Sequence, residues 1–256
     1  VILQRSVLNS MQKEKIIFLV GPTATGKTNI ALALAQRINA EIISCDSMQV
    51  YRGMRIISSQ PAVNLRKKIK HHLLAVIPPE KEYNVSGYRR QALKIIKGIF
   101  KKKKIPLFVG GSGLYMSILI DGIFKAKARN PALRKQLYKQ AEEKGSAYLY
   151  NRLKTVDPQA ASKIHPNDTR RIVRALEVFT STGRPISAWQ KQRKGLSSEY
   201  DVRIFGLAMP REKLKSRIDA RLEAMFAQGA LNEVRRLLKN KLSKTISSES
   251  FIRILI

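Results

Sequence analysis

One short segment restricts the possible fold more than any other part of the sequence. It reads Gly21-Pro22-Thr23-Ala24-Thr25-Gly26-Lys27-Thr28. This segment fits the pattern G-x-x-x-x-G-K-[ST], in which glycines let backbone N–H groups turn toward a phosphate chain. An apolar run, residues 16–20, precedes it, and a segment with helical spacing, residues 28–38, follows it. Strand, loop and helix in this order predict a phosphate-binding loop at the start of a helix.

Two side chains of this loop have predicted roles. In loops of this kind the lysine, here Lys27, reaches terminal phosphate oxygens, and the hydroxyl of Thr28 holds Mg²⁺. The pattern does not say which phosphate chain is bound. Binding of a nucleotide such as ATP and binding of a small diphosphate both stay open.

Strand and helix patterns alternate along most of the chain. Apolar runs predict further strands at residues 41–45, 105–109 and 202–207, and helical spacing predicts helices at residues 28–38, 85–99, 211–226 and 231–238. Alternation of this kind is typical of an α/β fold built on a parallel sheet. Together with the phosphate-binding loop, it predicts a sheet core like that of P-loop NTPases.

The middle of the chain differs, because residues 119–198 contain no clear strand pattern. Helices are predicted at residues 131–144, capped by Asn130, and at residues 168–180, capped by Asp168 and followed by Gly183. We therefore expect an α/β core formed by residues 11–118 and 199–256. A mostly helical insertion, residues 119–198, interrupts it.

Composition narrows the class of protein. Hydrophobic residues make up 44 % of the 256 residues, which is enough for a sizeable core. No apolar run approaches the ~20 residues of a membrane helix, and no segment resembles a signal peptide. The single cysteine, Cys45, cannot form an internal disulfide, so we expect a cytoplasmic protein without a membrane partner. Met11 remains a candidate start.

The chain carries 49 Lys or Arg and 18 Asp or Glu, a formal net charge of +31. Such an excess favours a polyanionic partner, and nucleic acid is the usual one. The excess runs through all parts of the chain, however. Charge alone therefore leaves both RNA binding and a generally lysine-rich composition open.

Polar residues follow the second and third predicted strands. Asp46 stands where ligands bind in open parallel sheets, and its carboxylate can act as a general base, help to anchor Mg²⁺, or merely start a turn. Gly110, Gly111 and Gly113 surround Ser112. These glycines allow either the close approach of a ligand or a tight turn.

Arginines concentrate at two helices. Arg170, Arg171 and Arg174 lie in the first turns of a predicted helix, where cations oppose the helix dipole. This placement indicates an external anion such as RNA phosphate, or else a solvated basic face. Arg217 and Arg221 are four residues apart, so they can clamp a diphosphate or pair with neighbouring acidic residues at the surface. The local sequence favours surface pairing, and a solvated helix end is expected for residues 101–104.

The motifs taken together resemble those of tRNA dimethylallyltransferases, the isopentenyl-tRNA transferase family. The resemblance extends over residues 15–240 and rests on segments in a fixed order: GPTATGKT, SCDSMQVYRGM, HHLL, YNVSGYRRQA, GGSGLY, DPQAASKIHPNDTRRIVRALEV and LAMPREKLKSRIDARLEAMFAQG. It implies transfer of a dimethylallyl group from dimethylallyl diphosphate to N6 of the adenosine adjacent to the tRNA anticodon. The anticodon stem-loop is the expected partner, its adenine is expected to leave the base stack, and the enzyme is expected to be a monomer.

The resemblance also implies roles for individual residues. Asp46 matches the general base, Arg221 matches an arginine that binds the diphosphate, and Mg²⁺ is expected near Thr28. The loop is expected to hold the diphosphate of the prenyl donor. Positions that match tRNA contacts are Asp46, Ser47, Met48, Gln49, Ser112, Arg134, Arg170, Arg171, Ile172, Val173 and Arg174.

Two segments depart from the family pattern. Residues 55–61 read Arg-Ile-Ile-Ser-Ser-Gln-Pro where the family has Asp-Ile-Gly-Thr-Ala-Lys-Pro, and residues 247–256 do not resemble the family's continuation. A truncated or frame-shifted C-terminus is therefore expected. Two alternative functions share the loop, namely a small-molecule kinase and a basic RNA-binding protein that uses the loop as a nucleotide switch.

Overall fold

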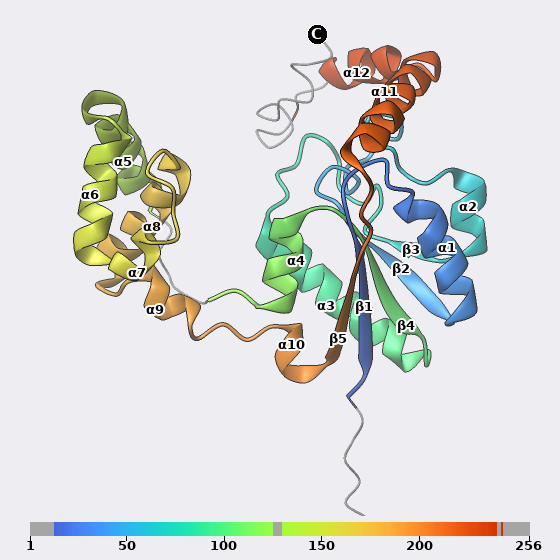
Figure 1. Cartoon of the computed structure of the whole chain (residues 1–256), viewed down its shortest axis with the longest axis horizontal. Helices are drawn as coiled ribbons and strands as arrows, with labels where there is room; N and C mark the ends of the chain where they lie inside the picture. Colours follow the sequence, from blue (N-terminus) through green and yellow to red (C-terminus); the bar gives the residue numbers. More distant parts are fainter. Residues whose placement is uncertain (1–12, 125–129, 240–241, 243–256) are drawn as a thin grey trace, which may run out of the picture. The chain divides into compact units, whose positions relative to one another are not determined.

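The computed structural model describes residues 13–124, 130–239 and 242, so Met11 and residues 247–256 lie outside the described residues. The chain divides into two compact units (Figure 1). One unit comprises Val1–Ile120 with Leu196–Ile256, and the other comprises Asp121–Gly195. The first unit contains the sheet, and the second consists of helices.

The first unit is built on a parallel sheet of five strands in the order β3-β2-β4-β1-β5. The strands are β1 (Lys15–Val20), β2 (Ala40–Cys45), β3 (His71–His72), β4 (Ile105–Gly110) and β5 (Asp201–Gly206). The four strands predicted from apolar runs are confirmed. β3 was not predicted, because two residues are too few to show a strand pattern.

The helices around this sheet are α1 (Lys27–Arg37), α2 (Val63–Lys68), α3 (Val85–Lys101), α4 (Gly113–Ile120) and α10 (Leu196–Glu199). Two more, α11 (Arg211–Ala227) and α12 (Ala230–Leu238), lie beyond the carboxyl ends of the strands (Figure 1). Ile17 and Leu19 of β1 pack with Ala31 and Ala35 of α1 in one core cluster. Since side chains alternate along a strand, Phe18 lies on the opposite face, where its ring stacks on Phe108. The predicted α/β fold with a parallel sheet is confirmed.

The second unit contains α5 (Pro131–Lys144), α6 (Ser146–Val156), α7 (Pro158–Ala161), α8 (Thr169–Thr182) and α9 (Ile186–Gln190). Its described residues form no strand. The predicted caps are present: the side chains of Asn130 and Asp168 accept hydrogen bonds from Leu133 N and Arg171 N, and Gly183 ends α8 with a positive φ. These helices surround a small core of their own, which includes Leu149, Leu153 and Leu176.

Candidate active site

The phosphate-binding loop connects β1 to α1, as its sequence predicted. Gly21 and Gly26 have φ values of +149° and +89°, which L side chains rarely adopt. A Cβ at Gly21 would lie 2.6 Å from the carbonyl oxygen of Leu207, so this position also requires glycine because of the close backbone approach. Thr25 has a structural role, since it is buried and its hydroxyl donates to the carbonyl of Pro22.

A cavity of about 620 Å³ opens beside this loop at the carboxyl ends of the strands. The loop residues Thr23, Lys27 and Thr28 line one side of it, with Asp46 and Ser112 from the ends of β2 and β4. Its further lining residues are Gly21, Pro22, Ala24, Gly26, Ala31, Ile42, Ser44, Gln49, Ser58, Ser59, Pro61, His71, Leu74, Val109, Gly110, Gly111, Arg217 and Arg221. The sheet thus brings together residues that are far apart in sequence.

Lys27 is held inside this cavity. Its Nζ donates to the carbonyls of Gly21 at 2.8 Å and Pro22 at 2.5 Å. Burial, together with the nearby cation of Arg221, lowers the pKa of Lys27, while Asp46 opposes that shift. Two cations that repel each other in a partly buried site favour binding of an anion between them.

Asp46 directly follows β2 and lines the cavity. Its Oδ1 accepts hydrogen bonds from Met48 N at 2.8 Å and Gln49 N at 3.4 Å, which fixes a turn. No described residue donates a hydrogen bond to Oδ2. The carboxylate therefore starts a turn and also places one oxygen where a substrate can reach it.

Ser47 and Ser112 tie the ends of β2 and β4 together. The backbone N–H of Ser47 donates to Ser112 Oγ at 3.0 Å, and Ser112 N donates to the carbonyl of Cys45 at 3.2 Å. A Cβ at Gly110 would lie only 2.1 Å from that carbonyl oxygen. Gly110, the last residue of β4, therefore allows a close approach between two strand ends, while Ser112 still lines the cavity.

The side-chain amide of Gln49 makes hydrogen bonds to other residues of the protein. Its Oε1 accepts from Ser44 Oγ at 2.9 Å, and its Nε2 donates to the carbonyls of Ser58 and Ser59, both at 3.3 Å. These contacts connect the end of β2 to the turn formed by residues 54–60. Gln49 thus shapes the wall of the cavity.

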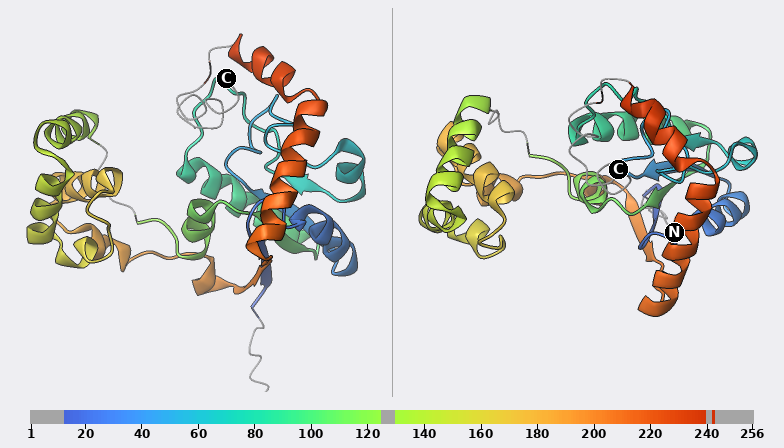
Figure 2. Two further views of the ribbon diagram at one scale, coloured as in Figure 1. Left: turned by 45° about the horizontal axis from the view of Figure 1, so that its top comes forward. Right: turned by 90° about the horizontal axis from the view of Figure 1, so that it is seen from above.

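α11 lies beyond the carboxyl ends of the strands (Figures 1 and 2). Two of its arginines, Arg217 and Arg221, line the cavity. Arg221 donates from Nη1 to Thr23 Oγ1 at 2.6 Å and from Nε to Ser59 Oγ at 3.0 Å. Arg217 Nη1 lies 3.4 Å from the carbonyl oxygen of Ala24. The surface pairing favoured by the local sequence is therefore wrong for Arg221, which faces the phosphate-binding loop.

A second cavity, of about 260 Å³, shares Thr23, Asp46, Ser58 and Arg221 with the first. Its remaining lining residues are apolar: Met48, Met54, Ile57, Ile218, Leu222 and Met225. Sequence reasoning missed it, because these residues come from two segments whose contact no local pattern reveals. An apolar space thus lies directly beside the cationic one.

The helical unit gives two of the predicted tRNA-contacting arginines an internal partner. Arg134 and Arg174 each donate to Oε2 of the fully buried Glu177 at 2.7 Å, and Asn130 N donates to its Oε1. Burial alone would raise the pKa of Glu177, but these hydrogen bonds together hold it below its ordinary value. The two arginines are still about two-fifths exposed, so their positions are fixed without being covered.

The other predicted residues of α8 divide into two groups. Arg170 and Arg171 are exposed, and Arg171 Nε lies 3.4 Å from Asp168 Oδ2. Ile172 and Val173 are buried in the core of the helical unit. The expectation that they contact tRNA is therefore wrong for their side chains, because the helical period turns them away from the arginine face.

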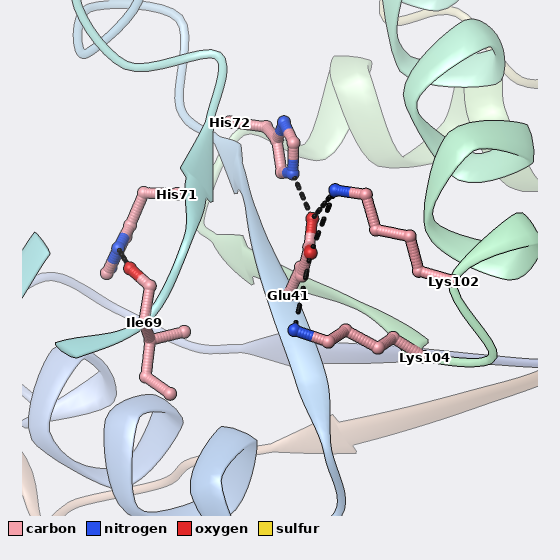
Figure 3. A network of polar contacts seen from close by, with 6 residues as sticks. All are labelled: Glu41, Ile69, His71, His72, Lys102 and Lys104. Atoms are coloured by element: carbon pink, nitrogen blue, oxygen red, sulfur yellow. Dashed lines mark hydrogen bonds and ion pairs between the residues drawn. The ribbon is translucent and has the colours of Figure 1, made fainter. Parts of the chain in front are cut away.

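The lysines after α3 are exposed or partly exposed, as expected for a solvated helix end, but two of them also pair with a buried carboxylate. Lys102 and Lys104 Nζ lie 3.1 Å and 3.5 Å from Oε1 of the buried Glu41, and His72 Nε2 lies 2.7 Å from its Oε2 (Figure 3). Burial opposes ionisation of Glu41, but its hydrogen bonds with His72 and Lys102 bring its pKa below the ordinary value. Glu41 stands at the amino end of β2, so this cluster stabilises the sheet away from the cavity.

Among the residues that the structure describes, no group of three or more His, Cys, Asp or Glu side chains is placed to hold a metal ion. No helix among those residues is long and apolar enough to cross a membrane.

The sequence matches two family models, one described as "IPP transferase" over residues 49–255 and one described as "Isopentenyl transferase" over residues 14–75. A tRNA dimethylallyltransferase of Caldicellulosiruptor saccharolyticus is 43 % identical over 93 % of this chain and 77 % of its own length. That of Natranaerobius thermophilus is 43 % identical over 91 % of this chain and 70 % of its own length.

Solved structures agree with these relatives. A tRNA isopentenylpyrophosphate transferase from Bacillus halodurans has a TM-score of 0.65 and 32 % identity, covering 95 % of this chain and 76 % of that one. A eukaryotic dimethylallyltransferase acting on tRNA has a TM-score of 0.75 and 32 % identity, covering 88 % of this chain and 56 % of that one. The chain therefore belongs to the IPP transferase family, whose curated relatives carry the name tRNA dimethylallyltransferase.

Proposed function

We propose that this protein is a tRNA dimethylallyltransferase. It transfers the dimethylallyl group of dimethylallyl diphosphate to N6 of the adenosine adjacent to the tRNA anticodon. The observation that carries the proposal is the arrangement around Asp46. This carboxylate borders both a cationic cavity beside a phosphate-binding loop and a smaller apolar cavity.

The diphosphate of the donor binds in the larger cavity. The backbone of the loop and the amino end of α1 bind its oxygens, and Lys27 and Arg221 balance its charge. When the bond between the allylic carbon and oxygen breaks, negative charge grows on the leaving diphosphate. Both cations are in place before that step, so they stabilise the developing charge without rearranging.

The adenine amino group is the nucleophile. As N6 forms its bond to the allylic carbon, it must lose a proton, and the free oxygen of Asp46 accepts that proton. The turn formed with Met48 and Gln49 holds the carboxylate in one orientation. The products are a dimethylallylated tRNA, a diphosphate and a proton first held on Asp46, so atoms and charges balance.

Mg²⁺ fits this site as a cofactor. The hydroxyl of Thr28 and the carboxylate of Asp46 line the same cavity, and both are oxygen ligands of the kind that Mg²⁺ takes along with substrate phosphates. When bound, it would supply further neutralisation of the diphosphate charge. Thr28 would be its protein ligand.

We propose that tRNA binds through several basic positions of the helical unit. Arg170, Arg171, Arg134 and Arg174 all have exposed parts, and the whole chain carries a net charge of +31. Ser47, Met48 and Gln49, near Asp46, would border the reacting adenosine. The protein would work in the cytoplasm, where tRNA is modified, and as a monomer.

Incubation with dimethylallyl diphosphate, Mg²⁺ and an unmodified tRNA tests the proposal. Mass spectrometry of the digested tRNA should show one dimethylallyl group on the adenosine beside the anticodon. A tRNA with uridine in that place is the matched control and should stay unmodified. Hydrolysis of ATP in the absence of tRNA, with no prenyl transfer, would instead favour a kinase or a nucleotide switch.

A further inference from the structure

A buried carboxylate outside the two cavities has no part in the mechanism above. Glu233 of α12 is 7 % exposed. It shares a helix face with Ala230, Val234 and Leu237, and these three pack against residues 50–57 in one core cluster. An ionised side chain in such a place is costly unless it is hydrogen-bonded.

The partners of Glu233 are backbone N–H groups of a different segment. Ile56 N donates to its two carboxylate oxygens at 2.9 and 3.0 Å, and Ile57 N donates to Oε1 at 3.0 Å. Residues 54–60 form a tight turn that is closed by bonds from Ser59 N to Ile56 O and from Gln60 N to Arg55 O. Glu233 therefore caps the start of this turn with a negative charge, much as an acidic residue caps a helix.

The far end of the same turn is strained. Ser59 has a φ of +48°, in the left-handed region that non-glycine residues rarely occupy. Such a conformation persists only where its surroundings fix it. Gln49 Nε2 holds the carbonyls of Ser58 and Ser59, and Glu233 holds the N–H groups at the opposite end. The turn is thus secured from both sides.

Ser59 is the link to the cationic cavity. Its Oγ accepts from Arg221 Nε at 3.0 Å, and the other end of that guanidinium donates to Thr23 of the phosphate-binding loop. The orientation of the Arg221 guanidinium therefore depends on where the turn places the hydroxyl of Ser59. A continuous set of hydrogen bonds runs from Glu233 through the turn to Arg221.

We infer that Glu233 is a positioning residue for the diphosphate site. It does not contact the ligand, but it fixes the turn of residues 54–60 and, through Ser59, aims Arg221 at the bound diphosphate. This inference rests on the proposed function, because it assumes a diphosphate beside the loop.

The test measures binding of inorganic diphosphate with Mg²⁺ by calorimetry, using the full chain without tRNA. Glu233→Ala should weaken binding about tenfold, the loss expected when one charge-assisted hydrogen bond is misplaced. Glu233→Gln keeps a carbonyl oxygen that can accept from the turn, so it should recover most of that affinity. Val234→Ala, on the same buried helix, controls for a general loss of stability and should bind diphosphate like the parent protein.

A double-mutant cycle tests whether Glu233 affects diphosphate binding through Arg221. In an Arg221→Ala background, Glu233→Ala should cause little further loss, because the residue it positions is already gone. Equal affinities of Glu233→Ala and the parent protein, equal losses in Glu233→Ala and Val234→Ala, or fully additive losses with Arg221→Ala would each overturn the inference. If the parent protein binds no diphosphate, the proposed donor site fails, and the inference fails with it.

Discussion

Arg221 Nη1 lies 2.6 Å from Thr23 Oγ1, although 198 residues separate the two along the chain. This contact joins α11 to the phosphate-binding loop. The two cations of the site therefore come from distant parts of the sequence, Lys27 from α1 and Arg221 from α11. Burial, and after it the nearby cation of Arg221, lowers the pKa of Lys27, and an anion bound between the two cations would relieve their repulsion.

Replacing Arg221 by lysine should weaken the enzyme although it keeps the charge. A guanidinium offers several donors in a rigid fork and contacts Thr23 and Ser59 at once, whereas an ammonium group acts as a point charge. We expect KM for dimethylallyl diphosphate to rise about tenfold and KM for tRNA to stay unchanged. Arg217→Lys is the control, since Arg217 Nη1 makes a long hydrogen bond of 3.4 Å to the carbonyl of Ala24, and the effect of this substitution should be much smaller. Equal effects of the two variants would contradict this role of Arg221.

Asp46→Asn should lower the rate of prenyl transfer and leave tRNA affinity almost unchanged. The asparagine Oδ1 can still accept from Met48 N and Gln49 N, so the turn is kept while the base is lost. Transfer in single-turnover experiments should fall by a factor of about 10² to 10⁴, the contribution typical of a general base. Affinity for tRNA should change less than threefold, or about 0.6 kcal/mol. A variant that turns over like the parent protein would exclude Asp46 as the base.

The sequence predicted the sheet and the phosphate-binding loop because their signals are local. Residues 16–20 are a continuous apolar run, and Gly21 to Thr28 follow it directly. Asp46 and Ser112 could be placed beside the loop for a topological reason, since the carboxyl ends of parallel strands meet at one edge. Family resemblance was needed to give Arg221 a role. Nothing near it in sequence indicates that Thr23 and Ser59 are its partners.

Long-range pairing explains what sequence reasoning missed or misjudged. Lys102 and Lys104 belong to a run of four lysines that resembles a solvated helix end, yet Glu41, some sixty residues earlier, holds both. Glu177 was not singled out, although it organises Arg134 and Arg174. For Ile172 and Val173 the signal was available, because the helical period that exposes Arg170 and Arg171 places the next two residues on the buried face.

Replacing arginines of the helical unit should affect tRNA affinity at one position and protein stability as well at another. Arg170→Ala removes an exposed cation, so tRNA affinity should fall and the slope of log Kd against log salt should decrease by about 0.9. Arg134→Ala also removes a partner of the buried Glu177 and should cost about 1–2 kcal/mol of unfolding free energy. Salt titrations of tRNA binding and urea unfolding measure the two effects. A salt slope unaffected by Arg170→Ala would mean that this face does not bind RNA.

Glu41→Gln should destabilise the protein at neutral pH but not in acid. The folded protein holds the pKa of Glu41 below its ordinary value through His72 and Lys102, despite burial, which acts in the opposite direction. A carboxyl group with a lowered folded pKa stabilises the fold fully above its unfolded pKa of about 4.3, and this stabilisation is lost as the pH falls through the folded pKa. We therefore expect a deficit of about 1–3 kcal/mol at pH 7 for Glu41→Gln, which shrinks as the pH falls below about 4. Urea unfolding at pH 7 and below pH ~4 measures this deficit. The control is Glu143→Gln, which breaks the exposed ion pair with Lys139 and should cost less than about 0.5 kcal/mol of unfolding free energy. A deficit that stays constant with pH would show that packing, and not the charge of Glu41, stabilises this end of β2.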